Sequence, residues 1–75
     1  MNRIGVSSTS IGEIGYESTS QTLEVQFLDG RLYEFFDVPA HVYQAFVAAP
    51  SIGTFFNKEI RDCYRYERRY PAGPD

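Results

Sequence analysis

The sequence predicts an α+β domain: a small antiparallel β-meander of about three strands, covered on one face by two short helices. Apolar and polar residues alternate over residues 21–27, the period of a half-buried strand, and a turn dipeptide, Asp29-Gly30, leads into an aromatic return strand. Apolar residues then recur at helical spacing over residues 42–60, with Pro50 between two such stretches. Together these patterns predict an α+β architecture.

Length and composition indicate one small domain. The 75 residues are 43% hydrophobic and include six Phe and six Tyr, whose large rings suit a small core. We expect the domain to span residues 1–70 and residues 71–75 to form a frayed tail. Cys63 is the single cysteine, so no internal disulfide forms, and no apolar run has the length of a signal peptide or a membrane span. These features predict a cytoplasmic location.

Further strands are expected on both sides of the hairpin. Residues 4–6 are typical of a short strand, and residues 7–10 of a turn or an irregular edge. Residues 11–16 place β-formers between glycines, which indicates a strand with a bulge or a close backbone approach. Near the C-terminus, residues 63–68 are a candidate for a fourth strand of the meander.

The hairpin has two alternative registers. A two-residue loop pairs Phe27 with Leu32, whereas a three-residue loop over residues 28–30 pairs Phe27 with Arg31 and needs Gly30 in the left-handed conformation. The choice matters because a slip of one residue moves every side chain to the other face of the sheet.

The register decides the environment of Tyr33 and Phe35. The two-residue loop places them on the face of Glu24 and Gln26, and the three-residue loop places them with the apolar residues of the preceding strand. The three-residue loop separates polar from apolar side chains better and is preferred. It leaves three apolar residues on the outer face, where they need cover from the C-terminal segment or from a partner: Leu28, Leu32 and Phe36.

Two helices are predicted after the hairpin. Pro39 is acceptable in the first turn of the first helix, Pro50 ends it, and Ser51 is a suitable N-cap for the second. The expected buried stripes consist of Val42, Tyr43, Phe46, Val47 and Ala49 in the first helix, and of Ile52, Phe55, Phe56 and Ile60 in the second.

The C-terminal segment carries most of the positive charge. The net charge of the chain is −3, but residues 58–70 hold five of the seven basic residues against three acidic ones. We call residues 58–70 the basic-aromatic segment. Arginine binds phosphate and stacks on rings, so one interpretation is an RNA-binding surface. The other is a terminal strand with tyrosines inward and charges in water. The residues predicted to contact RNA are Lys58, Arg61, Tyr64, Arg65, Tyr66, Arg68 and Arg69.

Tyr33 and Phe35 also have two interpretations. As exposed rings they form a platform on which bases stack, and as inward residues of a half-buried strand they belong to the core. The preferred register favours the core.

Catalytic and metal-binding chemistry are not predicted. His41 is the only histidine, Cys63 is the only cysteine, and nothing in their spacing predicts a nucleophile and base in contact. One histidine and one cysteine do not complete a zinc site, and neither common phosphate-binding glycine motif is present. We therefore expect a protein that is not an enzyme and has no cofactor and no metal.

The order and spacing of many positions over residues 4–69 carry a family resemblance. These positions include Ser8, Ile11, 14–16, 23–27, Gly30, 33–36, 38–39, 42–43, Ser51, Gly53, 56–57 and 60–61. In them the chain resembles the KTSC domain, a short module found at the C-terminus of some lysyl-tRNA synthetases and alone in bacterial proteins. The resemblance implies an α+β module of unestablished function, for which the link to tRNA synthetases suggests RNA binding. The family's central Tyr-x-Tyr motif is read here as Tyr33-Glu34-Phe35, and the missing hydroxyl favours a packing role.

Two functional hypotheses follow. The first is a non-catalytic module that binds RNA, either tRNA or another structured or single-stranded RNA, through the basic-aromatic segment. The alternative is a module for protein–protein interaction or self-association that uses the apolar outer face of the sheet, to which an acidic body is better suited. Neither hypothesis involves a membrane or a small-molecule cofactor.

Overall fold

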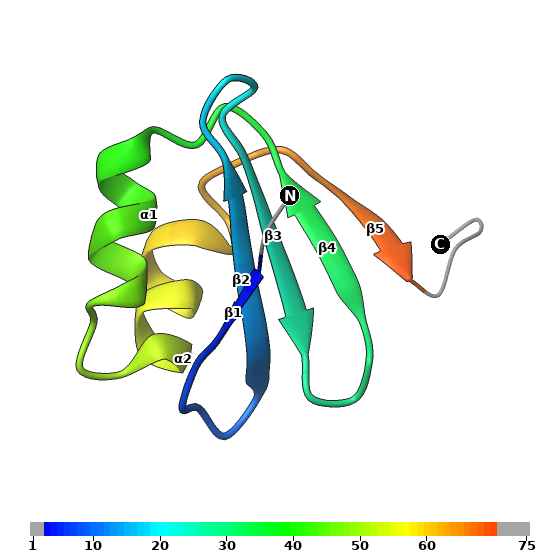
Figure 1. The fold of residues 1–75 in the computed structure, drawn as a ribbon, viewed down its shortest axis with the longest axis vertical. Helices are drawn as coiled ribbons and strands as arrows, with labels where there is room; N and C mark the ends of the chain where they lie inside the picture. Colours follow the sequence, from blue (N-terminus) through cyan, green and yellow to red (C-terminus); the bar gives the residue numbers. More distant parts are fainter. Residues whose placement is uncertain (1–2, 71–75) are drawn as a thin grey trace.

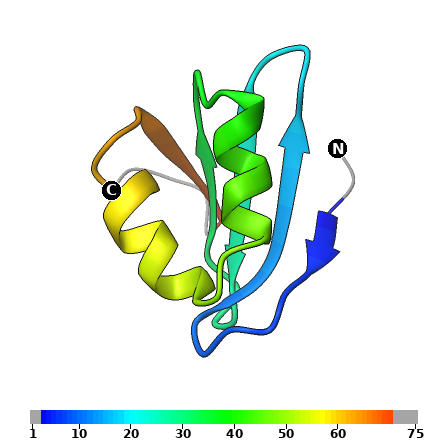
Figure 2. The ribbon, with the colours of Figure 1, turned by 90° about the vertical axis from the view of Figure 1, so that its left-hand side faces the viewer.

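A computed structural model describes residues 3–70, so the frayed tail predicted at residues 71–75 lies outside the described residues. The described chain forms one antiparallel sheet with strand order β1-β2-β3-β4-β5, and the helices lie on one face of it (Figures 1 and 2). The α+β class is confirmed. The elements are β1 (Arg3–Gly5), β2 (Ile11–Glu17), β3 (Thr22–Phe27), β4 (Leu32–Phe35), α1 (Ala40–Val47), α2 (Ile52–Phe55), the π-helical η1 (Phe56–Ile60) and β5 (Tyr66–Tyr70).

The sheet has five strands rather than the expected three or four. The two edge strands explain the difference, since β1 is exposed along its whole length and β5 along most of it. Neither strand therefore needs the alternating apolar pattern by which a half-buried strand is recognised. The last strand also begins at Tyr66, three residues later than predicted, because the chain turns over residues 61–64 after η1.

The bulge predicted in the second strand is confirmed. The pairing of β2 with β3 shifts register between Ile11 and Glu13. A side chain at Gly12 would bring its Cβ to 3.3 Å from the Leu28 side chain, so the glycine permits the close approach of the hairpin loop.

The hairpin adopts the preferred three-residue loop. The Phe27 amide donates to the Arg31 carbonyl at 2.8 Å, the Gly30 amide donates to the Phe27 carbonyl at 2.9 Å, and Gly30 has φ +96°. Val25 then lies opposite Tyr33. Residues 33 and 35 consequently face the helices, as the separation of polar from apolar side chains predicted.

The core lies between the helices and the centre of the sheet. The second helix begins as predicted, with the Ser51 hydroxyl accepting from the Thr54 amide at 3.3 Å. Four of the residues predicted for the buried helical stripes lie in the core, namely Phe46, Ile52, Phe56 and Ile60. The sheet and the loop before α1 supply the other buried apolar residues: Ile11, Ile14, Leu23, Val25, Phe35 and Val38.

Tyr16 joins the sheet to the first helix. Its hydroxyl donates to the carbonyl of Val38 at 2.6 Å, and its ring stacks on Tyr43 with centroids 4.8 Å apart and an interplanar angle of 9°. Burial raises the pKa of Tyr16 above its ordinary value of 10.0. The hydrogen bond therefore fixes the start of α1 against β2.

Replacing Tyr16 with Phe is expected to lower the free energy of unfolding by about 1 kcal/mol at neutral pH, because the Val38 carbonyl loses its donor. A raised pKa in the folded state means that the tyrosine's contribution is complete below the ordinary value of 10.0 and declines as the pH rises through the folded-state pKa. The difference in the free energy of unfolding between the wild type and Tyr16→Phe should therefore become smaller at alkaline pH. Urea unfolding at about pH 7 and about pH 11 measures it. A difference independent of pH would contradict this role for the hydroxyl.

Candidate nucleic-acid interface

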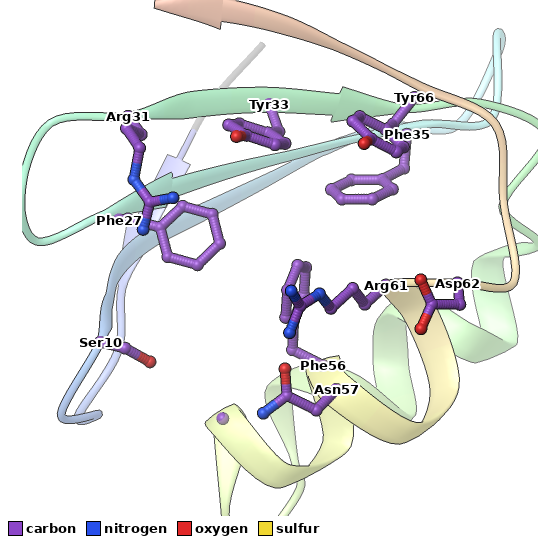
Figure 3. A pocket seen from close by; sticks show the side chains of 11 residues that line it. Ser10, Phe27, Arg31, Tyr33, Phe35, Phe56, Asn57, Arg61, Asp62 and Tyr66 are labelled. Carbon is purple, nitrogen blue, oxygen red and sulfur yellow. The ribbon is translucent and has the colours of Figure 1, made fainter.

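A cleft of about 460 Å³ opens between the helix-facing side of the sheet and the α2–η1 segment (Figure 3). Its volume falls within the range of sites that hold small ligands. We call it the aromatic cleft. Its described lining consists of Ser10, Phe27, Arg31, Tyr33, Phe35, Gly53, Phe56, Asn57, Arg61, Asp62 and Tyr66.

The cleft exists because the helices cover only part of the sheet. Phe35 on β4 is 1% exposed, whereas Tyr66, its partner on β5, is 50% exposed. Helical cover therefore ends between the last two strands. Apolar rings that would otherwise belong to the core are open to solvent along this boundary.

The sheet wall of the cleft is a set of mutually packed rings. Tyr33 and Tyr66 are stacked with centroids 5.6 Å apart and an interplanar angle of 14°. Phe27 meets Tyr33 edge to face at 5.7 Å and Phe56 edge to face at 5.4 Å. Each ring is held by its neighbours, so the wall offers preformed aromatic surface at little cost in side-chain entropy.

Arg31 is held at one side of the opening. Its guanidinium carbon lies 4.9 Å from the centre of the Phe27 ring, and its Nε lies 2.8 Å from Asp29 Oδ2. The backbone amide of Arg31, followed by its guanidinium, lowers the pKa of Asp29 below the ordinary value. The ionised carboxylate therefore keeps the Arg31 side chain in place.

Arg61 approaches the same opening from the helical side. Figure 3 shows its side chain crossing in front of the Phe56 ring, with the guanidinium directed into the cleft. Among residues 3–70, its side chain has no hydrogen bond or ion pair. Two guanidinium groups from distant parts of the chain thus reach one opening, an arrangement that favours an anion between them.

The π-helical turn places residues of the helical wall. The Arg61 amide donates to the carbonyl of Phe56, five residues back, at 2.9 Å. The wider turn directs Phe56 and Ile60 into the core, while Asn57 and Arg61 line the cleft. Single π-helical turns are often found at functional sites.

The sheet divides the basic-aromatic segment between its two faces. Arg61 and Tyr66 line the cleft, and Arg68 lies opposite Tyr33 on the same face. Lys58 is exposed but does not line the cleft, and Tyr64 packs partly against the core. The segment is therefore not a single surface, although several of its members do come together.

The other two arginines of the segment belong to the outer face. Arg69 Nε lies 2.7 Å from Glu34 Oε1, and this hydrogen bond raises the pKa of Arg69. The Arg65 guanidinium carbon lies 4.7 Å from the centre of the Phe36 ring, and its NH2 atom lies 4.0 Å from Asp37 Oδ2. These arginines pair with the acidic outer face rather than pointing to the cleft.

The core interpretation is confirmed for Phe35, while a role of Tyr33 as a stacking platform stays a prediction. Phe35 is a core residue, and Tyr33 is a half-buried ring in the cleft wall. Sequence reasoning did not assign Arg31 to a site. The signal for it was present, because the preferred register places Arg31 opposite Phe27 and hence on the helix-facing side of the sheet.

Within residues 3–70, no group of three His, Cys, Asp or Glu side chains lies close enough to hold a metal ion. Cys63 is exposed rather than packed as a small apolar residue, and His41 is exposed as well. Over the same residues, no helix is long and apolar enough to cross a membrane.

Fold and site together define a small α+β domain that carries a ligand-sized aromatic cleft flanked by arginines. The family model of the KTSC domain matches residues 7–66. The chain therefore belongs to the KTSC family, as its resemblance indicated.

Similar proteins occur both as single domains and as parts of a larger protein. A crystal structure of a KTSC domain protein from Yersinia pestis has a TM-score of 0.86 and 35% identity, and the match covers 91% of this chain and 96% of that one. An uncharacterised protein from Stutzerimonas stutzeri is 41% identical over 91% of this chain and 97% of its own length. A lysine–tRNA ligase from Trichormus variabilis is 45% identical over 77% of this chain, but the match spans only 10% of the ligase.

Proposed function

We propose that this KTSC domain is a non-catalytic module that binds RNA through the aromatic cleft. The observation that carries the proposal is the Tyr33–Tyr66 ring pair lying beside Arg31 and Arg61. Proteins recognise RNA mainly where bases are unpaired, by stacking them on aromatic rings and binding the backbone with arginine. The cleft combines these two kinds of group within one opening.

The charge distribution also favours the cleft over the outer face. On the outer face, Arg3 pairs with Glu24 at 2.8 Å and Arg69 pairs with Glu34 at 2.7 Å, so the arginines there already have acidic partners. A polyanion approaching the domain is repelled less at the cleft, where Arg61 has no acidic partner among the described residues. Because related segments lie within lysine–tRNA ligases, tRNA is the first RNA to test.

Two double variants with the same change in charge test the location. Arg31→Gln with Arg61→Gln is expected to weaken RNA binding strongly, because each contributes to the phosphate contact. Arg65→Gln with Arg69→Gln should have little effect. For single strands the slope of log K against log salt is about −0.7 per neutralised phosphate, so loss of the two arginines that share one phosphate should reduce the magnitude of the slope by about 0.7.

The measurement is an amide NMR titration of the labelled domain with a mixed tRNA pool at about 50 mM and about 200 mM salt. Unchanged amide spectra of the free variants show that the fold is intact. Equal losses in the two double variants would mean that RNA binds by diffuse charge alone. An unperturbed wild-type spectrum at the lower salt concentration would reject RNA binding.

The alternative proposal is protein interaction or self-association through the outer face, and it is favoured by Leu28, which is 63% exposed. The apolar area there is smaller than expected, since the Arg65 guanidinium lies over the Phe36 ring. Sedimentation at increasing protein concentration tests the self-association version of the alternative, because self-association raises the measured mass and a strictly monomeric protein rejects it.

A further inference from the structure

We infer that the aromatic cleft holds one unpaired nucleotide of an RNA strand, with its base against Tyr33 and its phosphate between Arg31 and Arg61. The inference rests on the proposed RNA-binding function and specifies what the site recognises. It concerns a single nucleotide unit rather than a length of backbone.

The base position follows from the orientation of the rings. Figure 3 shows the face of the Tyr33 ring turned toward the helical side of the cleft, and the Tyr66 ring lies only 14° from parallel to it. A base placed there stacks on the part of the Tyr33 ring that lines the cleft. On the facing wall, the Asn57 amide offers both donors and an acceptor to the edge of a base.

The phosphate position follows from the two arginines. Arg31 comes from the start of the hairpin's return strand and Arg61 from the end of η1, and Figure 3 shows both guanidinium groups on the opening of the cleft. Arg31 has Asp29 as a partner, while Arg61 has none among residues 3–70. A phosphate between them accepts hydrogen bonds from both and offsets their mutual repulsion.

The limit of one nucleotide comes from size and charge. A cleft of about 460 Å³ lies at the lower part of the range for small-ligand sites. Asp62 also lines it, so a second phosphate would meet a carboxylate on the same rim. A paired base is stacked on both faces within a helix, so the cleft selects unpaired nucleotides.

The test compares four probes in NMR titrations of the labelled full chain. The probes are adenosine 5′-monophosphate, adenosine, a short single strand of oligoadenylate, and the same strand paired with oligouridylate. The monophosphate and the single strand are expected to shift the amides of Tyr33, Asn57, Arg61 and Tyr66. The affinity for adenosine should be at least about tenfold lower than that for the monophosphate, because the charge-assisted hydrogen bonds to the phosphate are lost. The duplex should shift these amides least.

Arg61→Gln should lower the affinity for the monophosphate toward that for adenosine, because only Arg31 then remains to bind the phosphate. Lys58→Gln is the matched control, since it removes the same charge from an exposed side chain outside the cleft and should leave the affinity unchanged. Equal binding of adenosine and its monophosphate, or equal effects of the two variants, would overturn the inference. Oligoadenylate shifts that avoid the cleft would overturn the inference and the cleft as the RNA site, while RNA binding elsewhere on the domain would stand. If the monophosphate binds but neither the single strand nor the duplex does, RNA binding is rejected as the function. The cleft would then bind a free nucleotide rather than a nucleotide within an RNA strand.

Discussion

Replacing Phe46 with Ala is expected to lower the free energy of unfolding by about 3–5 kcal/mol, the range for loss of a fully buried ring. Phe46 has no exposed surface, and its ring stacks on Phe55 at 5.5 Å and lies 6.3 Å from Phe56. It is therefore the contact that holds α1 against the α2–η1 segment. Since small domains are stable by only about 5–15 kcal/mol, a large fraction of the stability would be lost.

Urea unfolding followed by circular dichroism measures this loss, with Leu28→Ala as the control. Leu28 is 63% exposed on the hairpin loop, so its truncation should change the free energy of unfolding by about 0.5 kcal/mol or less. A loss below about 1 kcal/mol for Phe46→Ala would show that α1 does not pack on the second helical segment as described.

Replacing Tyr33 with Leu is expected to weaken RNA binding by about ten- to a hundredfold, since stacking contributes about 1–3 kcal/mol per base. Tyr33 is the central ring of the cleft wall and contacts Tyr66, Phe27 and Phe35. Leucine retains apolar volume toward the core but offers no flat surface to a base. Fluorescence anisotropy with a labelled single-stranded RNA measures the affinity.

Two variants separate the role of the ring from other effects. Tyr33→Phe keeps the ring and should bind RNA nearly as well as the wild type, if stacking rather than the hydroxyl is responsible. Tyr43→Leu removes a half-buried tyrosine that stacks on Tyr16 outside the cleft, and it should not weaken binding. Similar losses in Tyr33→Leu and Tyr43→Leu would indicate a general effect on the fold and contradict the cleft as the RNA site.

The candidate site arises from incomplete helical cover of a small sheet. Phe35 on β4 is almost fully covered by the helices, whereas Tyr33 on the same strand is half-buried and Tyr66 on β5 is exposed. Within the three residues Tyr33-Glu34-Phe35, the strand changes from a half-buried ring in the cleft wall to a ring buried in the core. The hydroxyl that the family motif has at residue 35 would lie in the core here, which is consistent with a phenylalanine at that position.

The sequence by itself determined the features that depend on neighbours along the chain. The alternation in residues 21–27, the glycine at residue 30 and the preference for segregating polar from apolar side chains were enough to predict the hairpin register. Likewise, Ser51 and the stripe containing Phe46 predicted the second helix start and the helical core.

Only the tertiary structure decided which charged residues share a surface. The basic-aromatic segment is continuous in sequence, yet successive side chains of β5 alternate between the faces. Pairing with β4 decides that Arg68 shares the face of Tyr33, whereas Arg69 lies with Glu34. Arg31 and Arg61 are thirty positions apart and meet at the cleft because the hairpin end and the π-helical turn are packed across the same core. Local periodicity contains no information about such a meeting, since it depends on how far the helices extend over the sheet and where their cover ends.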